Sequence, residues 1–341
     1  MIHQARVLAP GVVSLDPVHL PACGPRDVIV DVHACGLCGS DLSYIRMGGL
    51  AGPNGEPMPL GHEFAGVVRE IGAEVGGVAV GQRVVVHPGD DDLGRIGSGA
   101  PEGGLADAVV VREAARGDRL YPVPDGMPLE VAALAEPVAV GMHAVEQADA
   151  ARGERVAVFG CGPIGLAAIA ALADRGLTDI VGIDLSATRR ALAGTLGASA
   201  TIDPAEQSPW RELARIHGEV PLTYGTAPAT EVFIEASGSG RVLTGIIDRA
   251  RRGARISVVA LHYAPVPVNF INVLMKELTI RGSMEYPERF ADAIELLARR
   301  DLSALITDRF ALAEVGAAVE FLEASRECGK VMVEMTARGP I

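Results

Sequence analysis

A glycine-rich turn places the strongest constraint on what this chain can fold into. It reads Gly160-Cys161-Gly162-Pro163-Ile164-Gly165, follows an apolar run at 155–159 and opens an Ala-rich helical pattern at 163–174. Glycines so spaced allow a tight turn, close approach of the backbone to a pyrophosphate and close packing of helix on strand. The first amides of the helix then point at the phosphates. The pattern predicts a dinucleotide site formed by Gly160, Gly162, Pro163, Ile164 and Gly165.

Asp184 extends this prediction to the choice of dinucleotide. It closes the next apolar run about 20 residues after the turn, where a carboxylate accepts hydrogen bonds from the adenine ribose and repels a 2′-phosphate. NAD is therefore favoured over NADP, although Arg189 and Arg190 stand nearby and arginine can accept a phosphate. The alternative is that Asp184 only caps the helix beginning at Ser186. Arg189 and Ser237 are also placed in the predicted cofactor site.

The rest of the chain divides into two patterns. Short Val-rich segments with Gly and Pro between them occupy the first 110 or so residues, at 27–33, 66–71, 83–86 and 106–111, and predict a barrel-like β region. From Pro137, apolar runs at 155–159, 180–184, 232–236 and 256–260 alternate with helical stretches at 163–174, 187–196 and 241–250. Such alternation is typical of a doubly wound parallel sheet covered on both faces.

The length of 341 residues also favours two domains, because one hydrophobic core stops growing at about 250–300 residues. A final helix at 290–300 and strand at 331–335 most simply return to the first domain. The predicted organisation is a catalytic domain at 1–137, a dinucleotide-binding domain at 138–284 and a return segment at 285–341.

Composition excludes several classes of function. With 30 basic and 43 acidic residues the net charge is −13, which repels nucleic acid and anionic lipid. The longest apolar run, at 164–173, is too short to span a bilayer, and the N-terminus lacks the pattern of a secretory signal. The five cysteines are too scattered for a disulfide framework, so a cytoplasmic location is expected.

Three further segments carry side chains that zinc accepts as ligands. They are Cys38-Gly39-Ser40-Asp41, Gly61-His62-Glu63 and Ala135-Glu136-Pro137. Cys38, His62 and Glu63, with Glu136 as a fourth ligand or a close neighbour of the metal, supply thiolate, imidazole and carboxylate groups. Each residue also has an ordinary explanation, because a single cysteine is more often a buried apolar residue and a lone histidine is more often hydrogen-bonded in a core. The residues alone leave both readings open.

These motifs together resemble the medium-chain, zinc-containing alcohol dehydrogenases over nearly the whole chain. Glu136 stands where the alcohol dehydrogenases proper carry a second cysteine, which is similar to the sorbitol, butanediol and threonine dehydrogenase branch. The resemblance implies a GroES-like β-barrel catalytic domain joined to a Rossmann doubly wound domain. It also implies that Cys38 and His62 are zinc ligands, that Glu63 and Glu136 share or exchange the remaining protein position, and that Asp41 orients His62.

Three positions depart from the family pattern. The stretch 87–104, where the family places an optional structural zinc, contains no cysteine, so one catalytic zinc per chain is expected. Ser43 stands where many relatives carry a histidine that passes the substrate proton to solvent, and serine cannot hold that proton near neutral pH. Leu105 replaces an aromatic residue that often faces the substrate, which weakens any transfer of substrate identity.

The implied reaction is NAD-dependent oxidation of a secondary alcohol, diol or polyol to the ketone. Zinc would act as a Lewis acid, with Ser40 nearest to accept the hydroxyl proton. Hydrophobic or cyclic alcohols remain open as substrates, and a zinc-independent quinone or enoyl reductase or a non-enzymatic dinucleotide sensor are the alternatives. Neither alternative needs the metal ligands, and Asp184 opposes the NADPH of the reductases. A homodimer or homotetramer is expected.

Overall fold

The computed structural model describes residues 1–50, 56–89 and 94–335, which form two compact units. The first unit contains residues 1–136 and 297–341, and the second contains residues 137–296. The sequence predicted limits at 137/138 and 284/285. The second limit differs because the break falls inside helix α9 (Ala291–Arg299), where no glycine or proline run marks it. Residues 336–341 of the predicted return segment, and 90–93 of the cysteine-free stretch, lie outside the described residues.

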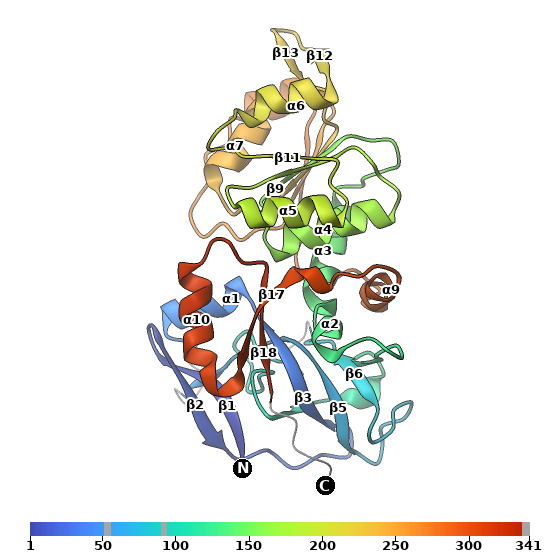
Figure 1. The fold of residues 1–341 in the computed structure, drawn as a ribbon, viewed down its shortest axis with the longest axis vertical. Helices are drawn as coiled ribbons and strands as arrows, with labels where there is room; N and C mark the ends of the chain where they lie inside the picture. The colour runs from blue at the N-terminus through green and yellow to red at the C-terminus, as the bar shows by residue number, and fades with distance from the viewer. Residues whose placement is uncertain (51–55, 90–93, 336–341) are drawn as a thin grey trace. The chain divides into compact units, whose positions relative to one another are not determined.

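Two sheets build the first unit (Figure 1). The smaller has the order β2-β1-β4, formed by β1 (Ile2–Ala9), β2 (Val12–Val18) and β4 (Met58–Pro59). The larger has the order β17-β18-β3-β5-β6-β8, with β7 also paired to β3. Its strands are β3 (Val28–Leu37), β5 (Glu63–Ile71), β6 (Arg83–Val86), β7 (Ala108–Val111), β8 (Leu120–Pro122), β17 (Ile306–Ala311) and β18 (Lys330–Glu334).

Strand β3 is the centre of this larger sheet. It pairs antiparallel with β5, β7 and β18, so segments from both ends of the chain meet along it. Its valines, among them Val28, Val30 and Val32, are buried in the core of the first unit. β-branched side chains suit such a pleated, buried surface. The predicted strands at 27–33, 66–71, 83–86 and 106–111 correspond to β3, β5, β6 and β7.

The helices of the first unit are short. They are α1 (Gly39–Met47), α2 (Leu129–Ala132) and α10 (Val315–Ala324), with 3-10 turns at Ala114–Arg116, Ser303–Leu305 and Leu312–Glu314. Helix α1 follows β3 directly and ends at Gly48, whose φ of 84° is the left-handed conformation that glycine adopts without strain. This places Cys38 at the junction between a central strand and a helix.

A six-stranded parallel sheet forms the second unit, in the order β11-β10-β9-β14-β15-β16. Its strands are β9 (Val156–Phe159), β10 (Ile180–Ile183), β11 (Ala200–Ile202), β14 (Val232–Glu235), β15 (Arg255–Val258) and β16 (Thr279–Gly282). The strand order reverses between β9 and β14. In open sheets of this kind ligands bind beyond the carboxyl ends of the strands at that reversal.

Five helices lie between these strands along the chain, namely α4 (Pro163–Asp174), α5 (Ala187–Leu196), α6 (Pro209–His217), α7 (Gly240–Arg249) and α8 (Phe270–Lys276). Helix α3 (Ala135–Gln147), which begins at the end of the first unit, precedes β9, and α9 follows β16. A small hairpin, β12 (Glu219–Pro221) and β13 (Thr226–Pro228), follows α6. Phe159, Phe233 and Trp210 pack together in the core of this unit. None of the helices in the described ranges has the length and apolar character needed to span a bilayer.

Candidate active site

The junction of β3 and α1 fixes two of the predicted residues. Cys38 caps α1 with an extended backbone, and the Asp41 carboxylate accepts a hydrogen bond of 2.9 Å from the Cys38 amide. Asp41 is fully buried. Burial raises the pKa of Asp41, and the nearby His62 and backbone amides offset only part of that rise. The start of α1 therefore fixes the backbone conformation of Cys38 and places the Asp41 carboxylate next to its amide.

His62 reaches the same place from the start of β5. Gly61 precedes it with φ of 91°, and a Cβ there would lie 2.5 Å from the Leu105 amide nitrogen, so only glycine fits. His62 Nδ1 lies 3.7 Å from Asp41 Oδ1, and neither atom has a hydrogen-bond partner among the described residues. Two buried polar atoms left facing each other indicate a pair that a small movement would join. Asp41 is thus placed where it can orient His62.

The charge around His62 suits a cation. Burial lowers the pKa of His62, but Asp41, Cys38 and Glu136 raise it by more, so the pKa lies well above its usual value. The anionic groups therefore stabilise a positive charge at this point. A metal ion bound to a neutral imidazole supplies such a charge.

Glu63 is the first residue of β5 and forms a buried ion pair. Lys330, the first residue of β18, donates to both carboxylate oxygens at 2.6 Å and to the Leu37 carbonyl at 3.1 Å. Burial lowers the pKa of Lys330, but Glu63, Cys38 and Glu136 raise it above its usual value overall. The sequence analysis missed Lys330. The only signal was a lysine directly before the apolar run 331–333.

Cys38, His62 and Glu63 form a group whose ligand atoms all lie within 4.8 Å of one another. Atoms bound to one zinc at 2.0–2.3 Å lie at most about 4.6 Å apart, so small side-chain rotations would suffice to bind an ion. Thiolate, imidazole and carboxylate are also a donor set that zinc accepts. The residues present therefore fit a zinc ion.

Glu136 stands apart from this group of three. It is the second residue of α3, is 5% exposed, and acts electrostatically on His62 and Lys330. It therefore lies near the cluster, but the described geometry does not bring its carboxylate into the set of mutually close ligand atoms. Its predicted role as a ligand stays a prediction.

The two predicted serines differ in their surroundings. Ser40 Oγ is buried and has no hydrogen-bond partner within the described ranges, which leaves it free to bind another group. Ser43 Oγ donates to the Gly39 carbonyl at 3.2 Å, a bond within α1 itself. Ser40 is thus the better placed of the two to accept a substrate proton, and Ser43 would first have to give up its helical bond.

The predicted dinucleotide turn joins β9 to α4 in the second unit. Gly160 has φ of 90°, and a Cβ there would lie 2.7 Å from the backbone of Ala236 and Ser237. A Cβ at Gly165 would overlap the Gly160 carbonyl oxygen. Gly162 is the N-cap residue of α4, and Pro163 is its first residue. A Cβ at Gly162 would have its nearest neighbour 4.0 Å away, on Arg189. Packing therefore requires glycine at positions 160 and 165, whereas the space beside Gly162, at the start of α4, is open.

Asp184 follows β10 and faces this turn. Its Oδ2 accepts a hydrogen bond from the Cys161 amide at 2.7 Å, and its Oδ1 accepts one from the Ser186 amide at 2.8 Å. The side chain that caps α5 is Ser186, which accepts a hydrogen bond from the Arg189 amide at 3.0 Å, so Asp184 binds the amide just before the helix and the glycine turn. Each carboxylate oxygen keeps further acceptor capacity for a ribose hydroxyl. Arg190 lies close by, bonded to the Asp184 carbonyl and paired with Asp203 at 2.9 Å.

Ser237 lies in a loop that a second buried carboxylate organises. Glu235, the last residue of β14, accepts hydrogen bonds from the Ser237 and Gly238 amides at 2.9 and 3.1 Å. The His262 ring lies 2.8 Å from the other oxygen of Glu235. The Ala236 and Ser237 backbone of this loop packs on Gly160, so the Glu235 and His262 pair helps to hold the glycine turn in position. The sequence analysis did not identify Glu235 or His262.

Two arginines bind the described part of the cysteine-free stretch. Arg119 donates to the carbonyls of His87, Pro88 and Gly94. Arg112 pairs with Glu102 at 3.0 Å and with Asp27 at 2.9 Å. Within the described residues of 87–104 no cysteine is present, so their sequence offers no thiolate set for a second zinc.

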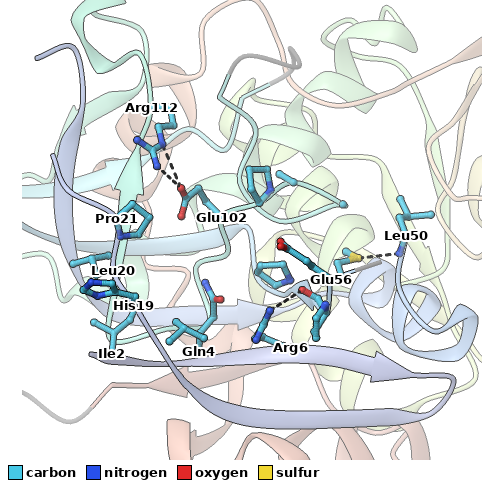
Figure 2. Close-up of a pocket in the computed structure, with 17 residues that line it drawn as sticks. Ile2, Gln4, Arg6, His19, Leu20, Pro21, Leu50, Glu56, Glu102 and Arg112 are labelled. Atoms are coloured by element: carbon cyan, nitrogen blue, oxygen red, sulfur yellow. Dashed lines mark hydrogen bonds and ion pairs between the residues drawn. The ribbon is translucent and has the colours of Figure 1, made fainter. Parts of the chain in front are cut away.

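A pocket of about 620 Å³ opens in the first unit beside this stretch (Figure 2). Figure 2 shows Arg6 bonded to the Pro57 carbonyl and Arg112 bonded to Glu102 at its edges. None of the described residues that line it belongs to the Cys38 cluster. The pocket is therefore separate from the candidate metal ligands.

Known proteins share both halves of this architecture. The family model of the alcohol dehydrogenase GroES-like domain matches residues 24–125, and that of the zinc-binding dehydrogenases matches residues 163–299. The chain is 32% identical over 337 residues to the (R,R)-butanediol dehydrogenase of Neisseria gonorrhoeae, covering 90% of this chain and 92% of that protein. It is 32% identical over 340 residues to the sorbitol dehydrogenase of Rattus norvegicus, covering 94% and 92%.

A solved structure agrees with these sequence matches. The 2R,3R-butanediol dehydrogenase of Bacillus subtilis matches with a TM-score of 0.85 and 29% identity, covering 98% of this chain and 99% of that one. The GroES-like match falls in the first unit, and the zinc-binding dehydrogenase match falls mainly in the unit that holds the doubly wound parallel sheet. The chain belongs to the medium-chain, zinc-containing alcohol dehydrogenase family, and it is similar to the sorbitol and butanediol dehydrogenases. The predicted family and fold class are confirmed.

Proposed function

We propose that this dehydrogenase uses one zinc ion and NAD to oxidise a secondary alcohol, vicinal diol or polyol to the ketone. The observation that carries the proposal is the Cys38, His62 and Glu63 cluster, which lies at the junction of β3 with α1 and at the start of β5, in a chain that also holds the glycine turn. A zinc-independent quinone or enoyl reductase has no use for that cluster, and neither does a non-enzymatic dinucleotide sensor.

The proposed reaction assigns a role to each of several residues. Bound zinc supplies Lewis-acid chemistry that acidifies the substrate hydroxyl, and NAD accepts the hydride. Cys38 and His62 hold the metal, and Asp41 fixes the direction of the His62 ring. Ser40 Oγ, buried and without a partner in the described ranges, takes up the hydroxyl proton only as it gives up its own proton toward solvent, since it also cannot retain an extra proton near neutral pH. Ser43 serves only as a bridge, because a hydroxyl does not retain a proton near neutral pH.

NAD is proposed as the cofactor because of Asp184. Solved relatives of this fold include one complex with NADP and one with NADH, so the fold alone does not select the cofactor. A carboxylate at the end of β10 disfavours a 2′-phosphate by charge repulsion and by desolvation. The candidate contacts to NAD are Gly160, Gly162, Pro163, Ile164, Gly165, Asp184, Arg189 and Ser237.

The substrate class follows from the relatives and from Glu136. The similar proteins from N. gonorrhoeae and R. norvegicus are named for butanediol and sorbitol, which are both alcohols with more than one hydroxyl group. Hydrophobic and cyclic alcohols form the second candidate class, because Leu105 stands where the family often carries an aromatic residue that faces the substrate, so substrate identity does not transfer directly.

A homodimer or homotetramer in the cytoplasm completes the proposal. Large apolar side chains are exposed on one stretch of the second unit, namely Phe270, Ile271, Leu274, Met275 and Ile280 on α8 and β16. Exposed apolar groups concentrated in this way favour association. All five cysteines are free, which agrees with a reducing compartment.

The decisive experiment combines metal analysis with a panel of alcohols and ketones. The purified protein is expected to hold about one zinc per chain and to turn over diols or polyols with NAD faster than with NADP. A protein with two zinc ions per chain contradicts the single-site prediction. Full activity without zinc refutes the proposed mechanism, and turnover of cyclic alcohols alone moves the substrate to the second class.

A further inference from the structure

A buried polar side chain without a partner lines the pocket of about 620 Å³ in the first unit. Gln4 is 8% exposed and lies on β1 between Ile2 and Arg6, which line the same pocket because alternate residues of a strand face one side. Its side-chain amide has no hydrogen-bond partner among the described residues, and Figure 2 shows the amide directed into the pocket. A buried amide left in this way is costly, so it is available to a ligand.

Glu102, in the segment before β7, points into the same space (Figure 2). It is 7% exposed, and Arg112 donates two hydrogen bonds, at 3.0 and 3.3 Å, to its Oε1. The other oxygen, Oε2, has no partner among the residues that the structure describes, and Arg112 is shared with Asp27 at 2.9 Å. Burial raises the pKa of Glu102, and Arg112 offsets only part of that rise. Glu102 therefore presents an acceptor that lacks full compensation by positive charge.

The other charged groups of the pocket do not supply that charge. Arg6 Nη1 lies 3.7 Å from Asp16 Oδ2, its Nη2 donates to the Pro57 carbonyl at 3.4 Å, and its Nε is buried. Glu56 lines the pocket and has no ion-pair partner within the described ranges. Among the groups that line the pocket or pair with them, two guanidinium groups therefore stand against four carboxylates. This balance favours a cation and disfavours an anion.

The walls of the pocket are aliphatic. Ile2, Leu20, Pro21, Met58 and Pro59 supply them, and Ile2 and Met58 belong to the buried core. Apolar walls with a few convergent polar groups are typical of sites for small organic molecules, and the volume falls within the range of such sites. A hydrated inorganic cation would make no use of these walls. The pocket therefore suits a cation that carries a carbon chain.

We propose that this pocket binds a small aliphatic ammonium compound, whose N–H groups donate to Glu102 and Gln4 and whose carbon chain packs on the aliphatic walls. An ammonium group has three donors and one positive charge, and its hydrogen bond to a carboxylate is of the stronger, charge-assisted kind. The Gln4 amide can turn its oxygen toward such a donor, because no described residue holds it. None of the described lining residues belongs to the Cys38 cluster, so binding here does not depend on the proposed zinc chemistry.

The test compares three probes that share a carbon chain and differ in charge. Butylamine, which is protonated at neutral pH, butyramide and butyrate are each titrated into the protein by calorimetry. We expect butylamine to bind with a Kd of about 1 mM or lower, as suits so small a ligand, and the other two to bind at least about tenfold more weakly. Cys38→Ser should bind butylamine equally well, which separates this site from an amine bound to zinc.

Variants of the two polar residues locate the binding. Glu102→Gln keeps the shape of the side chain but removes its charge, and should weaken butylamine binding by about tenfold or more. Gln4→Met removes the amide and should weaken it by about 2 to 10 times. Glu70→Gln removes a charge from an exposed residue of β5 outside the pocket and should leave binding unchanged. If Glu102→Gln does not fold, Gln4→Met and Glu56→Gln carry the same test.

Nuclear magnetic resonance gives a second measurement. The side-chain amide signals of Gln4, assigned by their loss in Gln4→Met, should shift as butylamine is added. Butylamine that does not bind saturably, or that binds Glu102→Gln and the unmutated protein equally, overturns the proposal. Tighter binding of butyrate would show that the arginines govern the pocket and would overturn it as well. Calcium that displaces butylamine at a far lower concentration would show a site for an inorganic cation and would overturn the proposed class of ligand.

Discussion

The two units stabilise their buried polar groups in different ways. In the first unit, Glu63 is paired with Lys330 from a strand 267 residues away in the sequence, and His62 lies among anionic groups. In the second unit, Asp184 is bound by backbone amides close to it in space, one of them two residues ahead. The other buried histidine, His217, has a threonine hydroxyl as its neighbour and a lowered pKa.

This difference agrees with what each site is proposed to bind. A metal needs side chains converging from several strands, so its charges depend on partners that substitution can remove. A dinucleotide is bound mainly by a turn and a helix start, where the backbone supplies the donors. Substitutions of charged side chains should therefore have larger effects in the first unit than in the second.

Removal of Cys38 should have the largest effect. Cys38→Ser takes away a thiolate ligand, so we expect zinc content near zero and activity lower by about 1000-fold, since a catalytic metal contributes several kcal/mol to the barrier. Metal analysis and steady-state rates check this, with circular dichroism to confirm the fold. Cys23→Ser, at another partly exposed cysteine of the same unit, should change neither quantity. Near-normal turnover of Cys38→Ser would refute the zinc mechanism.

Loss of one partner of the Glu63 and Lys330 pair should be the next largest effect. Glu63→Leu leaves Lys330 buried beside a single carbonyl, and we expect the metal-free protein to lose about 3 kcal/mol of unfolding free energy. Adding Lys330→Met should restore most of that loss, because two apolar side chains replace the two charges. Urea unfolding of the unmutated protein, Glu63→Leu, Lys330→Met and the double variant measures the loss of unfolding free energy and its recovery. A double variant as unstable as Glu63→Leu would show that the pair contributes more than charge compensation.

The sequence was informative where a function depends on neighbouring residues. Helices α4 and α5 begin and end where their apolar patterns do, at 163–174 and 187–196, and the glycine turn lies between a strand and α4 as its spacing predicted. Cys38, His62 and Glu63 also come together, although their identification as a set depended on family resemblance and not on spacing.

The contacts that the sequence did not predict join residues that lie far apart along the chain. Lys330 in β18 pairs with Glu63 in β5, and His262, in the loop after β15, pairs with Glu235 at the end of β14. Nothing in the local sequence specifies which partner a buried side chain will meet. Glu63 likewise has a partner that its sequence context did not indicate, because Lys330 binds both oxygens of its carboxylate. Pairing across a sheet is set by register and topology, which emerge only when the whole domain folds.

His217 should give the second unit a pH-dependent stability. Burial is the main cause that lowers the pKa of His217 from the usual 6.5 to about 4. As pH falls from 6.5 to 4, the unfolded chain binds a proton that the folded protein does not, so stability falls over that range. The shift is worth up to about 3 kcal/mol, and partial screening by solvent reduces it to about 2 kcal/mol.

Thermal or urea unfolding between pH 4 and pH 7 tests this contribution. His217→Gln keeps a hydrogen-bonding group toward Thr230 and cannot titrate, so its stability should fall less than that of the unmutated protein over the same range. Equal pH dependence in the two proteins would show that His217 is not the group responsible. Above pH 7 the two proteins should differ only by a constant amount.

Asp184 should show the smallest effect on stability and a specific effect on cofactor choice. Asp184→Ser removes the carboxylate that repels a 2′-phosphate, and Arg190, which bonds the residue 184 carbonyl, can then meet the phosphate. We expect the ratio of kcat/KM for NAD to that for NADP to fall by about tenfold or more, a change of roughly 1.4 kcal/mol. Stability should fall by only about 1 kcal/mol, as for the loss of a helix cap.

Asp203→Ser provides the matched control for this prediction. It frees the Arg190 side chain from its ion pair but leaves the Asp184 carboxylate in place. If repulsion by Asp184 sets the preference, Asp203→Ser should keep NAD as the better cofactor, because an available arginine does not remove the clash. If instead Asp203→Ser alone shifts the preference to NADP, the availability of Arg190 decides the specificity. An unmutated enzyme that prefers NADP would mean that Asp184 serves only to bind the Cys161 and Ser186 amides.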